Sequence, residues 1–274
     1  TLDNVRNPKW GNTVALFDDY RDQLFAAQKI VDGRGMLCNF LENHDKTRII
    51  DRFLMPEDQN RYSEKMLPVT NFFLPGIVFL YQGQEIGMRD NPKQSIQGFV
   101  DKPTFAIYDR LIAEGKTDAE ALEQINRESR EHSRTPMQWD ASENAGFSEA
   151  QPWIRVNANY KKINVENALA DSDSVFYYYQ KLIALRHELP IITDGVYELL
   201  DAENEKIYAY LRKGEKESLI VLCNFTDETV EYEVDESVKA ERSELVISNY
   251  KDAPEKFASK ITMKPYGAYV YYTK

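Results

Sequence analysis

The sequence predicts an α/β region followed by a separate all-β domain. Apolar residues at helical spacing in Thr13–Val31 precede an apolar segment, residues 36–41, that is short enough for one buried strand. A helix followed by a strand is the order that α/β proteins use. From Ile191 onward, short apolar or alternating segments separated by turn residues indicate antiparallel strands. We therefore divide the chain into an α/β part, residues 1–189, and a small antiparallel β-sandwich, residues 190–274.

Further helices and a second strand continue the α/β pattern. Residues 61–74 predict a helix interrupted by Pro68, and a β-branched and aromatic segment, residues 77–81, predicts the next strand. Another helix begins after Ser174 and is closed by Pro190.

The region between these helices, residues 90–134, predicts an excursion from the α/β core that contains no strand. Thr117 and Glu120 match a capping box, in which the N-cap residue and the third helical residue bind each other's backbone amides. We therefore expect a helix over about residues 118–132.

Several segments of the second part predict strands, and Gly, Asp, Glu or Asn turns separate them. These segments are residues 207–213, 218–225, 229–234, 244–250 and 267–273.

The charge balance narrows the class of ligand. The 274 residues contain 34 Lys and Arg against 45 Asp and Glu, a formal net charge of −11. Such an acidic chain is poorly suited to nucleic acid or an anionic membrane surface, and it suits a protein with a neutral ligand. No apolar run approaches the roughly 18 residues of a membrane span, and no signal peptide opens the chain. Since the first residue is Thr1, we expect the chain to begin within a longer polypeptide.

The two cysteines, Cys38 and Cys223, lie in separate apolar strand segments. This placement favours buried free thiols over a disulfide. Free thiols fit a reducing compartment, so we expect a cytoplasmic protein.

A dense group of polar residues, Glu42–Arg48, directly follows the strand expected at 36–41. Barrel enzymes carry their functional side chains at the carboxyl ends of the strands, where such a change from apolar to polar residues occurs. A carboxylate, an imidazole and a guanidinium this close in sequence can bind a polyhydroxylated ligand and respond to charge that develops on it. The sequence therefore predicts a ligand site at this strand end.

Asn43–Asp45 after an apolar strand resembles the seventh-strand motif of the α-amylase superfamily, glycoside hydrolase family 13. Phe72–Met88 resembles the eighth strand of that family and the loop after it. Arg134–Phe147 resembles a tract of the α-glucosidase branch, which includes oligo-1,6-glucosidases, dextran glucosidases and trehalose-6-phosphate hydrolases. The resemblance implies the C-terminal part of a (β/α)8 barrel, with the seventh and eighth strands and their helices, followed by the β-sandwich. The first six strands are expected in a missing N-terminal part of the same polypeptide.

The resemblance also implies roles for particular residues. Asp45 would be catalytic, as the carboxylate that stabilises the transition state, with His44 beside it as a ligand of sugar hydroxyls. Arg134 would bind the glucosyl unit at the non-reducing end, and it could also pair with Asp45 or hold the excursion to the barrel. Arg48 would bind substrate at the rim or form a structural ion pair. The alternative for Asp45 and His44 is a helix cap and a structural imidazole.

Other side chains near these motifs have less specific expectations. Gln84 and Glu85 would shape the pocket floor through hydrogen bonds. Trp139, Phe147 and Trp153 could stack on sugar faces, but we expect them to be part of the core.

Two departures from the family pattern leave the substrate linkage open. Lys46 and Thr47 stand where many members have Gln-Pro, and Pro103 occupies the position of a glutamate that helps to place the leaving sugar in some relatives. The α-1,6 linkage, the α-1,4 linkage and trehalose 6-phosphate all stay possible.

Retaining glycoside hydrolysis needs a nucleophilic carboxylate and an acid/base carboxyl about 5–5.5 Å apart. The tracts that carry both in this family are absent, as is the calcium-type loop, and no cofactor or metal is expected. We expect the C-terminal portion of a retaining α-glucosidase that acts on small α-glucoside oligosaccharides and is inactive by itself. The alternatives are a non-catalytic carbohydrate-binding or structural remnant, and a portion of a glucosyl-transferring or isomerising relative.

Overall fold

The computed structural model describes residues 17–31, 34–234, 238 and 242–274. The expected start of the first helix, residues 13–16, lies outside the described residues. Packing divides the described chain into two compact units. The first comprises the described residues up to Asn39 together with Phe53–Phe79 and Tyr178–Lys274, and the second comprises Phe40–Arg52 and Leu80–Tyr177. The units cut across the expected boundary between residues 189 and 190, because helices from the early sequence pack on the C-terminal sheet.

The second unit is built mainly from short helices. Its α-helices are α2 (Ile49–Phe53, which ends at the edge of the unit), α4 (Lys102–Ala113), α5 (Asp118–Glu128) and α6 (Val165–Ala170). Short 3-10 helices connect them at Gln84–Ile86, Ile96–Gly98, Arg130–Arg134, Glu143–Gly146 and Ala158–Lys161. Residues 90–134, all of which the structure describes, contain no strand, as the sequence predicted.

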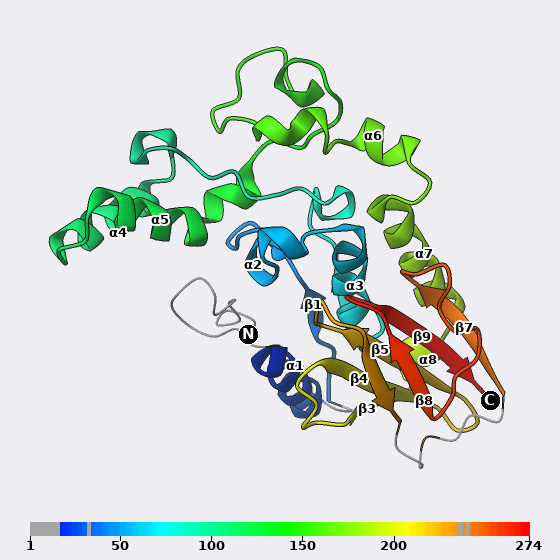
Figure 1. Cartoon of the computed structure of the whole chain (residues 1–274). Coiled ribbons are helices and arrows are strands. Elements are labelled where there is room, and N and C mark those ends of the chain that lie inside the picture. Colours follow the sequence, from blue (N-terminus) through cyan, green and yellow to red (C-terminus); the bar gives the residue numbers. More distant parts are fainter. Residues whose placement is uncertain (1–16, 32–33, 235–237, 239–241) are drawn as a thin grey trace. The chain divides into compact units, whose positions relative to one another are not determined.

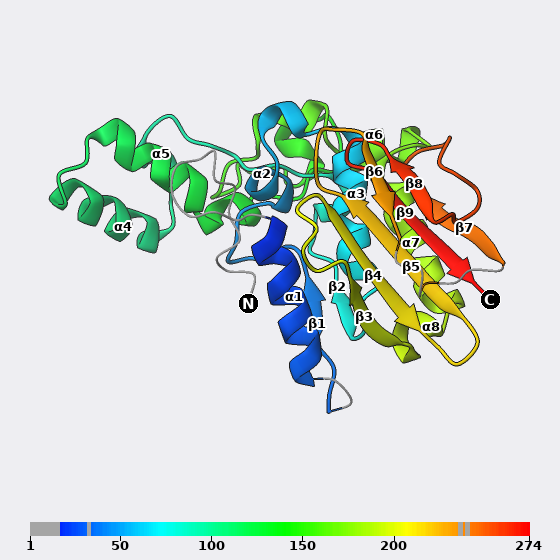
Figure 2. The ribbon, with the colours of Figure 1, turned by 60° about the horizontal axis from the view of Figure 1, so that its bottom comes forward.

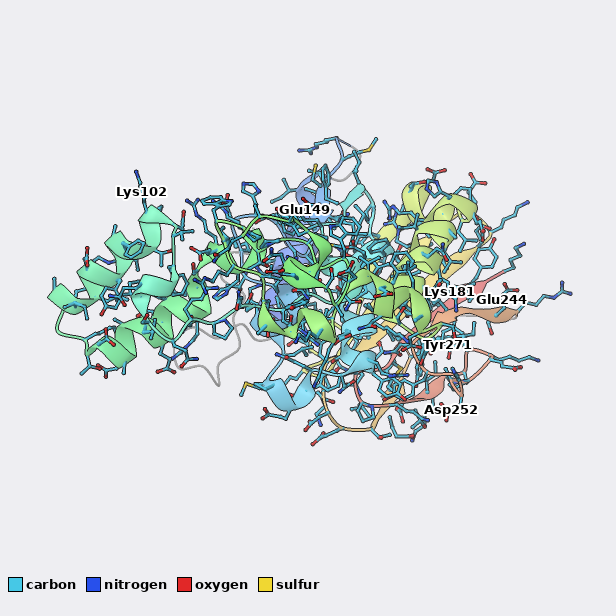
Figure 3. The ribbon with its side chains drawn as sticks, turned by 90° about the horizontal axis from the view of Figure 1, so that it is seen from above. Lys102, Glu149, Lys181, Glu244, Asp252 and Tyr271 are labelled. Carbon is cyan, nitrogen blue, oxygen red and sulfur yellow. The ribbon has the colours of Figure 1, made fainter. Side chains whose placement is uncertain are left out.

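Helices α4 and α5 pack against each other as a hairpin (Figure 1). The predicted capping box is confirmed, because the Thr117 hydroxyl accepts a hydrogen bond from the Glu120 amide and the Glu120 carboxylate accepts one from the Thr117 amide at 2.8 Å. Helix α5 ends earlier than expected because the chain turns into a 3-10 helix at Arg130. Helix α4 was not predicted. Figure 3 shows its first residue, Lys102, with a side chain directed away from the hairpin.

The first unit contains two antiparallel sheets. The larger has the strand order β3-β4-β5-β9-β7, and β6 pairs with β8 in the smaller (Figure 2). The strands are β3 (Val196–Leu200), β4 (Ile207–Lys213), β5 (Ser218–Asn224), β6 (Val230–Glu233), β7 (Ser243–Ser248), β8 (Lys260–Met263) and β9 (Ala268–Thr273). The five predicted segments correspond to β4, β5, β6, β7 and β9, whereas β3 and β8 were not predicted.

Alternation along β4 divides its side chains between two apolar layers. Ile207, Ala209 and Leu211 belong to one buried cluster with Tyr232 of β6 and Met263 of β8. This cluster lies between the two sheets, as side chains of period two on facing strands require. The predicted β-sandwich is therefore confirmed.

Helices from the early sequence cover the other face of β4. These are α1 (Phe17–Val31) and α3 (Arg61–Phe72). The ring of Tyr20 in α1 packs edge-on against Tyr208, with centroids 6.3 Å apart, and the Tyr210 hydroxyl donates to the Val69 carbonyl of α3 at 3.3 Å. The C-terminal sheet thus depends on two helices that precede it by more than a hundred residues.

Helix α3 runs through Pro68 without interruption, which corrects the sequence-based expectation. The Asn60 side chain caps its first turn by accepting hydrogen bonds from the Tyr62 and Ser63 amides. Buried residues on both sides of Pro68, such as Leu67 and Val69, pack in the core, and this packing offsets the hydrogen bond that proline removes.

Strands β1 (Cys38–Phe40) and β2 (Ile77–Phe79) pair with each other and are shorter than predicted. Helices α7 (Val175–Glu188) and α8 (Ile191–Asp194) lie on either side of Pro190. Both cysteines are free, as expected, and Cys223 is buried in β5. The expectation that Cys38 is buried is wrong, because β1 pairs with β2 alone among the described strands and its outer face is uncovered.

Candidate active site

The loop that follows β1 is anchored by a buried carboxylate. Glu42 accepts hydrogen bonds from the Ile49 amide and from Nη1 of Arg48, both at 2.9 Å. One side chain therefore fixes the start of α2 and the end of the loop together. Within the loop, the Asn43 side-chain oxygen accepts from the Asp45 amide at 2.8 Å, which holds a tight turn. As a result, His44 and Asp45 stand on the surface of this unit.

The Asp45 carboxylate is half exposed, and its two oxygens have different partners. Oδ1 accepts from Nη2 of Arg134 at 2.7 Å and from Nη1 of Arg130 at 3.1 Å. Oδ2 lies 3.2 Å from Nε2 of His44. One oxygen is therefore bound by two guanidinium groups, while the other faces an exposed imidazole.

Arg134 joins the site through two hydrogen bonds. Besides its bond to Asp45, its Nε donates to the His44 carbonyl at 2.7 Å. The 3-10 helix Arg130–Arg134 places both arginines at the same carboxylate. Of the interpretations that the sequence allowed for Arg134, pairing with Asp45 is the one that the structure contains.

Arg48 is fully buried and does not lie at the rim. Its Nη1 donates to Glu42 and to the Gln82 carbonyl at 2.8 Å, and its guanidinium carbon lies 5.4 Å from the centre of the Tyr81 ring. A guanidinium that is fully buried and paired with a carboxylate is out of reach of a sugar. The structure thus contains the ion-pair alternative for Arg48.

Opposing effects act on the acidity of Asp45. Partial burial of the carboxyl acts to raise its pKa, but the field of His44 and the hydrogen bonds from Arg130 and Arg134 outweigh burial. The pKa of Asp45 therefore lies below its usual value, and the group is a carboxylate at neutral pH.

The loop after β2 is bonded to the segment that carries Arg130 and Arg134. Gln84 is buried, and burial raises the pKa of the Glu85 carboxyl. The Tyr81 hydroxyl donates to the Ser133 carbonyl at 3.0 Å, which joins this loop to the segment that carries the arginines. The role of Gln84 and Glu85 in shaping the pocket floor through hydrogen bonds remains a prediction.

Arg130 was not identified from the sequence. Its Nε and Nη2 donate to the two carboxylate oxygens of Asp101, at 2.9 and 3.1 Å. The only sequence signal is its spacing, four residues before Arg134, and that spacing is common on helices. The pairing depends on the folded position of Asp101, which sequence spacing does not predict.

The three aromatic side chains that were expected in the core are exposed. Trp139 and Phe147 are each 49% exposed, and Trp153 is 80% exposed. Trp139 and Phe147 flank a turn in which Asn144 and Ala145 adopt left-handed backbone conformations. This turn is closed by its own hydrogen bonds, such as Trp139 to Ala145 at 2.8 Å, and does not require the rings as core.

In the described part of the chain, no cluster of three or more His, Cys, Asp or Glu side chains could hold a metal ion. Nor does any helix there combine the length and apolar character that crossing a bilayer requires. The candidate site therefore consists of one exposed carboxylate, one imidazole and two guanidinium groups, a set that can accept and donate hydrogen bonds to vicinal hydroxyls.

Asp45 and its arginines lie at a loop that follows a strand, which is where barrel enzymes carry their functional side chains. The chain belongs to the α-amylase family. The family model described as "Alpha amylase, catalytic domain" matches residues 2–195, and the model described as "Maltogenic Amylase, C-terminal domain" matches residues 197–270. The two matches meet close to the start of β3.

Characterised relatives narrow the comparison further. An oligo-1,6-glucosidase from Parageobacillus thermoglucosidasius is 38% identical over an alignment of 274 positions that covers 98% of this chain and 48% of that protein. The crystal structure of Bacillus licheniformis trehalose-6-phosphate hydrolase superimposes with a TM-score of 0.92 at 38% identity, over 100% of this chain and 50% of that one. A trehalulose synthase from Pseudomonas mesoacidophila MX-45 gives a TM-score of 0.91 at 31% identity, over 100% of this chain and 50% of that one. The chain thus spans about half the length of the relatives that it matches.

Proposed function

We propose that this chain is the C-terminal portion of a retaining α-glucosidase that removes glucosyl units from the non-reducing end of short oligosaccharides. In this proposal Asp45 stabilises the transition state, and His44 and Arg134 complete its side of the glucose site. Arg48 supports the loop from within and does not contact sugar. The observation that carries the proposal is the half-exposed Asp45 carboxylate, with Oδ1 bound by arginines and Oδ2 directed to His44.

The chemistry of glycoside hydrolysis suits this arrangement. An oxocarbenium-like transition state flattens the sugar ring and draws positive charge toward the anomeric carbon. A carboxylate oxygen that accepts hydrogen bonds from ring hydroxyls binds more strongly as those hydroxyls become more acidic. The depressed pKa of Asp45 keeps this oxygen charged through the reaction.

The nucleophile and the acid/base carboxyl must come from polypeptide that this chain does not contain. Support comes from the first unit, where Met36, Ile77 and Phe79 of the β1–β2 region are 76%, 51% and 53% exposed. In a closed barrel each strand pairs on both sides and its faces are covered. We therefore propose that an N-terminal portion of the same polypeptide pairs with these strands and supplies both carboxylates.

A glucosyl-isomerising activity is the second candidate. Its support is the similarity to a trehalulose synthase at 31% identity. The more similar oligo-1,6-glucosidase favours hydrolysis. Product analysis separates the two, because a hydrolase releases glucose from sucrose or isomaltose while an isomerising enzyme returns a disaccharide of altered linkage.

We also propose a compartment for the protein, on the basis of its cysteines. Cys38 and Cys223 are both free thiols, and Cys38 is exposed. This supports a reducing, cytoplasmic location and a role in intracellular carbohydrate metabolism.

The test joins this chain to the N-terminal half of the P. thermoglucosidasius oligo-1,6-glucosidase, which lies outside the matched region. Release of p-nitrophenol from p-nitrophenyl α-glucoside is then measured. We expect turnover by the hybrid, a loss of about 10²–10³-fold in kcat in Asp45→Asn, and no turnover by the 274-residue chain alone.

The matched control is Glu228→Gln, which removes an exposed carboxylate paired with Lys206 far along the sequence from the site. It should leave kcat unchanged. Turnover by the chain alone that survives Asp45→Asn contradicts the proposal. Saturable glucose binding that is equally indifferent to Asp45→Asn favours the non-catalytic carbohydrate-binding alternative.

A further inference from the structure

The two arginines at Asp45 differ in how they are held. Arg134 is fixed by the backbone, through its bond to the His44 carbonyl. Arg130 is fixed by a second carboxylate, because Asp101 accepts from its Nε at 2.9 Å and from its Nη2 at 3.1 Å. Nη1 of Arg130, at the far side of the guanidinium, donates to Asp45 at 3.1 Å.

The geometry of a guanidinium makes this arrangement directional. Its five N–H groups lie in one plane, so a carboxylate that binds one edge with two hydrogen bonds determines where the third nitrogen points. Asp101 is 14% exposed, against 48% for Asp45. The less exposed carboxylate therefore sets the orientation of Arg130, and Asp45 adapts to it.

Asp101 is itself anchored. The Val100 and Asp101 amides both donate to Oε2 of Glu131, at 2.8 and 3.0 Å, and Glu131 is buried. Glu131 and Arg130 are neighbours in the 3-10 helix, while Asp101 is the N-cap residue of α4. Glu131 thus binds backbone amides at the start of α4, and the adjacent Arg130 binds the Asp101 carboxylate. Together they fix the 3-10 helix to the start of α4.

We propose that Arg130 is a positioning residue that, held by Asp101, turns the Asp45 carboxylate so that Oδ2 is presented to the sugar. Both arginines bind Oδ1, and this fixes the rotation of the carboxylate about its Cβ–Cγ bond. The inference rests on the proposed function, since it assigns a purpose to Oδ2, the oxygen that faces His44. It also makes the start of α4 part of the structure that sets the geometry of the site.

Three variants of the 274-residue chain test the proposal: Arg130→Ala, Arg130→Lys and the control Arg127→Ala. Arg127 lies three residues earlier, pairs with Glu123 and has 32% of its side chain exposed, against 35% for Arg130. The Asp45 carboxyl is titrated by 13C NMR after selective aspartate labelling, with Asp45→Asn to assign its signal. Glucose binding is measured by calorimetry on the hybrid with the N-terminal half of the oligo-1,6-glucosidase, carrying the same substitutions, because this chain supplies only one side of the proposed glucose site.

In Arg130→Ala we expect the pKa of Asp45 to rise and the Kd for glucose to increase about three- to fivefold, the scale of a partly exposed ion pair. Arg130→Lys keeps the charge but cannot bind Asp101 with two bonds while it reaches Asp45. We therefore expect the pKa of Asp45 to recover in part and the Kd to stay at the value of Arg130→Ala. Arg127→Ala should match the wild type in both measurements.

An Asp45 titration that is the same in wild type and Arg130→Ala overturns the proposal, and so does full recovery of both quantities in Arg130→Lys, which would leave charge alone as the cause. If the hybrid with the wild-type chain binds no glucose, the proposed sugar site loses its support. The titration of the two Arg130 variants still decides the positioning role in that case.

Discussion

Glu42 and Arg48 form an ion pair that solvent does not reach, with Oε2 and Nη1 2.9 Å apart and side-chain exposures of 1% and 0%. The pair lies at the two ends of the loop that carries His44 and Asp45. Removing one member of such a pair leaves the other charge buried without compensation. We expect Glu42→Gln to lower the free energy of unfolding by about 3 kcal/mol.

Urea denaturation measures this loss, and an exposed ion pair provides the comparison. Lys206 and Glu228 are 48% and 61% exposed, so Glu228→Gln should lower the free energy of unfolding far less than Glu42→Gln does. Equal losses in the two variants would show that the buried pair contributes no more than a surface one.

His132 predicts a specific dependence of stability on pH. The imidazole is buried, its Nε2–H donates to the Asn126 carbonyl and its Nδ1 accepts from the Asn91 amide, each at 2.9 Å. Burial lowers the pKa of His132 from 6.5 to about 4, and protonation of Nδ1 would break the bond from Asn91. Between about pH 4 and pH 6.5, His132 is protonated in the unfolded chain and neutral in the folded chain. Stability is therefore complete above pH 6.5 and falls as the pH drops toward 4, by about 3 kcal/mol in all.

The measurement is the difference in unfolding free energy between the wild type and His132→Gln at several pH values from 7 to 4.5. Taking the difference cancels other titrating groups, among them Asp90, whose pKa is raised by burial and by Asp51 and which acts in the opposite direction. We expect the wild type to lose stability on acidification faster than the variant. Parallel curves would contradict a neutral buried imidazole.

Any side chain at Gly76 is predicted to destabilise the fold for steric reasons. It has a φ of 106°, and a Cβ at this position would lie 2.4 Å from the Leu37 carbonyl oxygen, next to the hydrogen bond from the Ile77 amide to that same oxygen. We expect Gly76→Ala to destabilise the chain by about 2 kcal/mol, from backbone strain and the loss of the β1–β2 contact.

Gly35→Ala is the matched control, because a Cβ there meets no atom within 4 Å. Thermal unfolding of the two variants should differ clearly. A similar Tm for both would mean that the chain around Leu37 adjusts without cost.

The two thiols should react at very different rates. Cys38 is exposed, whereas Cys223 is fully buried and burial raises the pKa of its thiol. With Ellman's reagent we expect one fast equivalent from the folded chain and two after denaturation in urea. Cys38→Ser should abolish the fast equivalent, and a fast phase that persists in that variant would place Cys223 within reach of solvent.

Local sequence signals were reliable where the interaction is local. The capping box of Thr117 and Glu120 formed as predicted, because both partners lie within one helical turn. Strands β4 and β5 were predicted from their composition, since buried strands need continuous apolar residues on both faces. Helix α4 was not predicted, although Pro103 is well suited to the first turn of a helix.

The sequence by itself determined the family, the loop that carries His44 and Asp45, and the sandwich of antiparallel strands, because each depends on residues close together in the chain. Only the tertiary structure decided which guanidinium groups reach Asp45. Arg130 and Arg134 follow it by 85 and 89 residues and arrive there through the packing of α4, α5 and the 3-10 helix. Arg48 is only three residues from Asp45, but its side chain points into the protein and donates to the Glu42 carboxylate and the Gln82 carbonyl. A buried charge is stable only when it is paired, and the fold provides these partners in the interior.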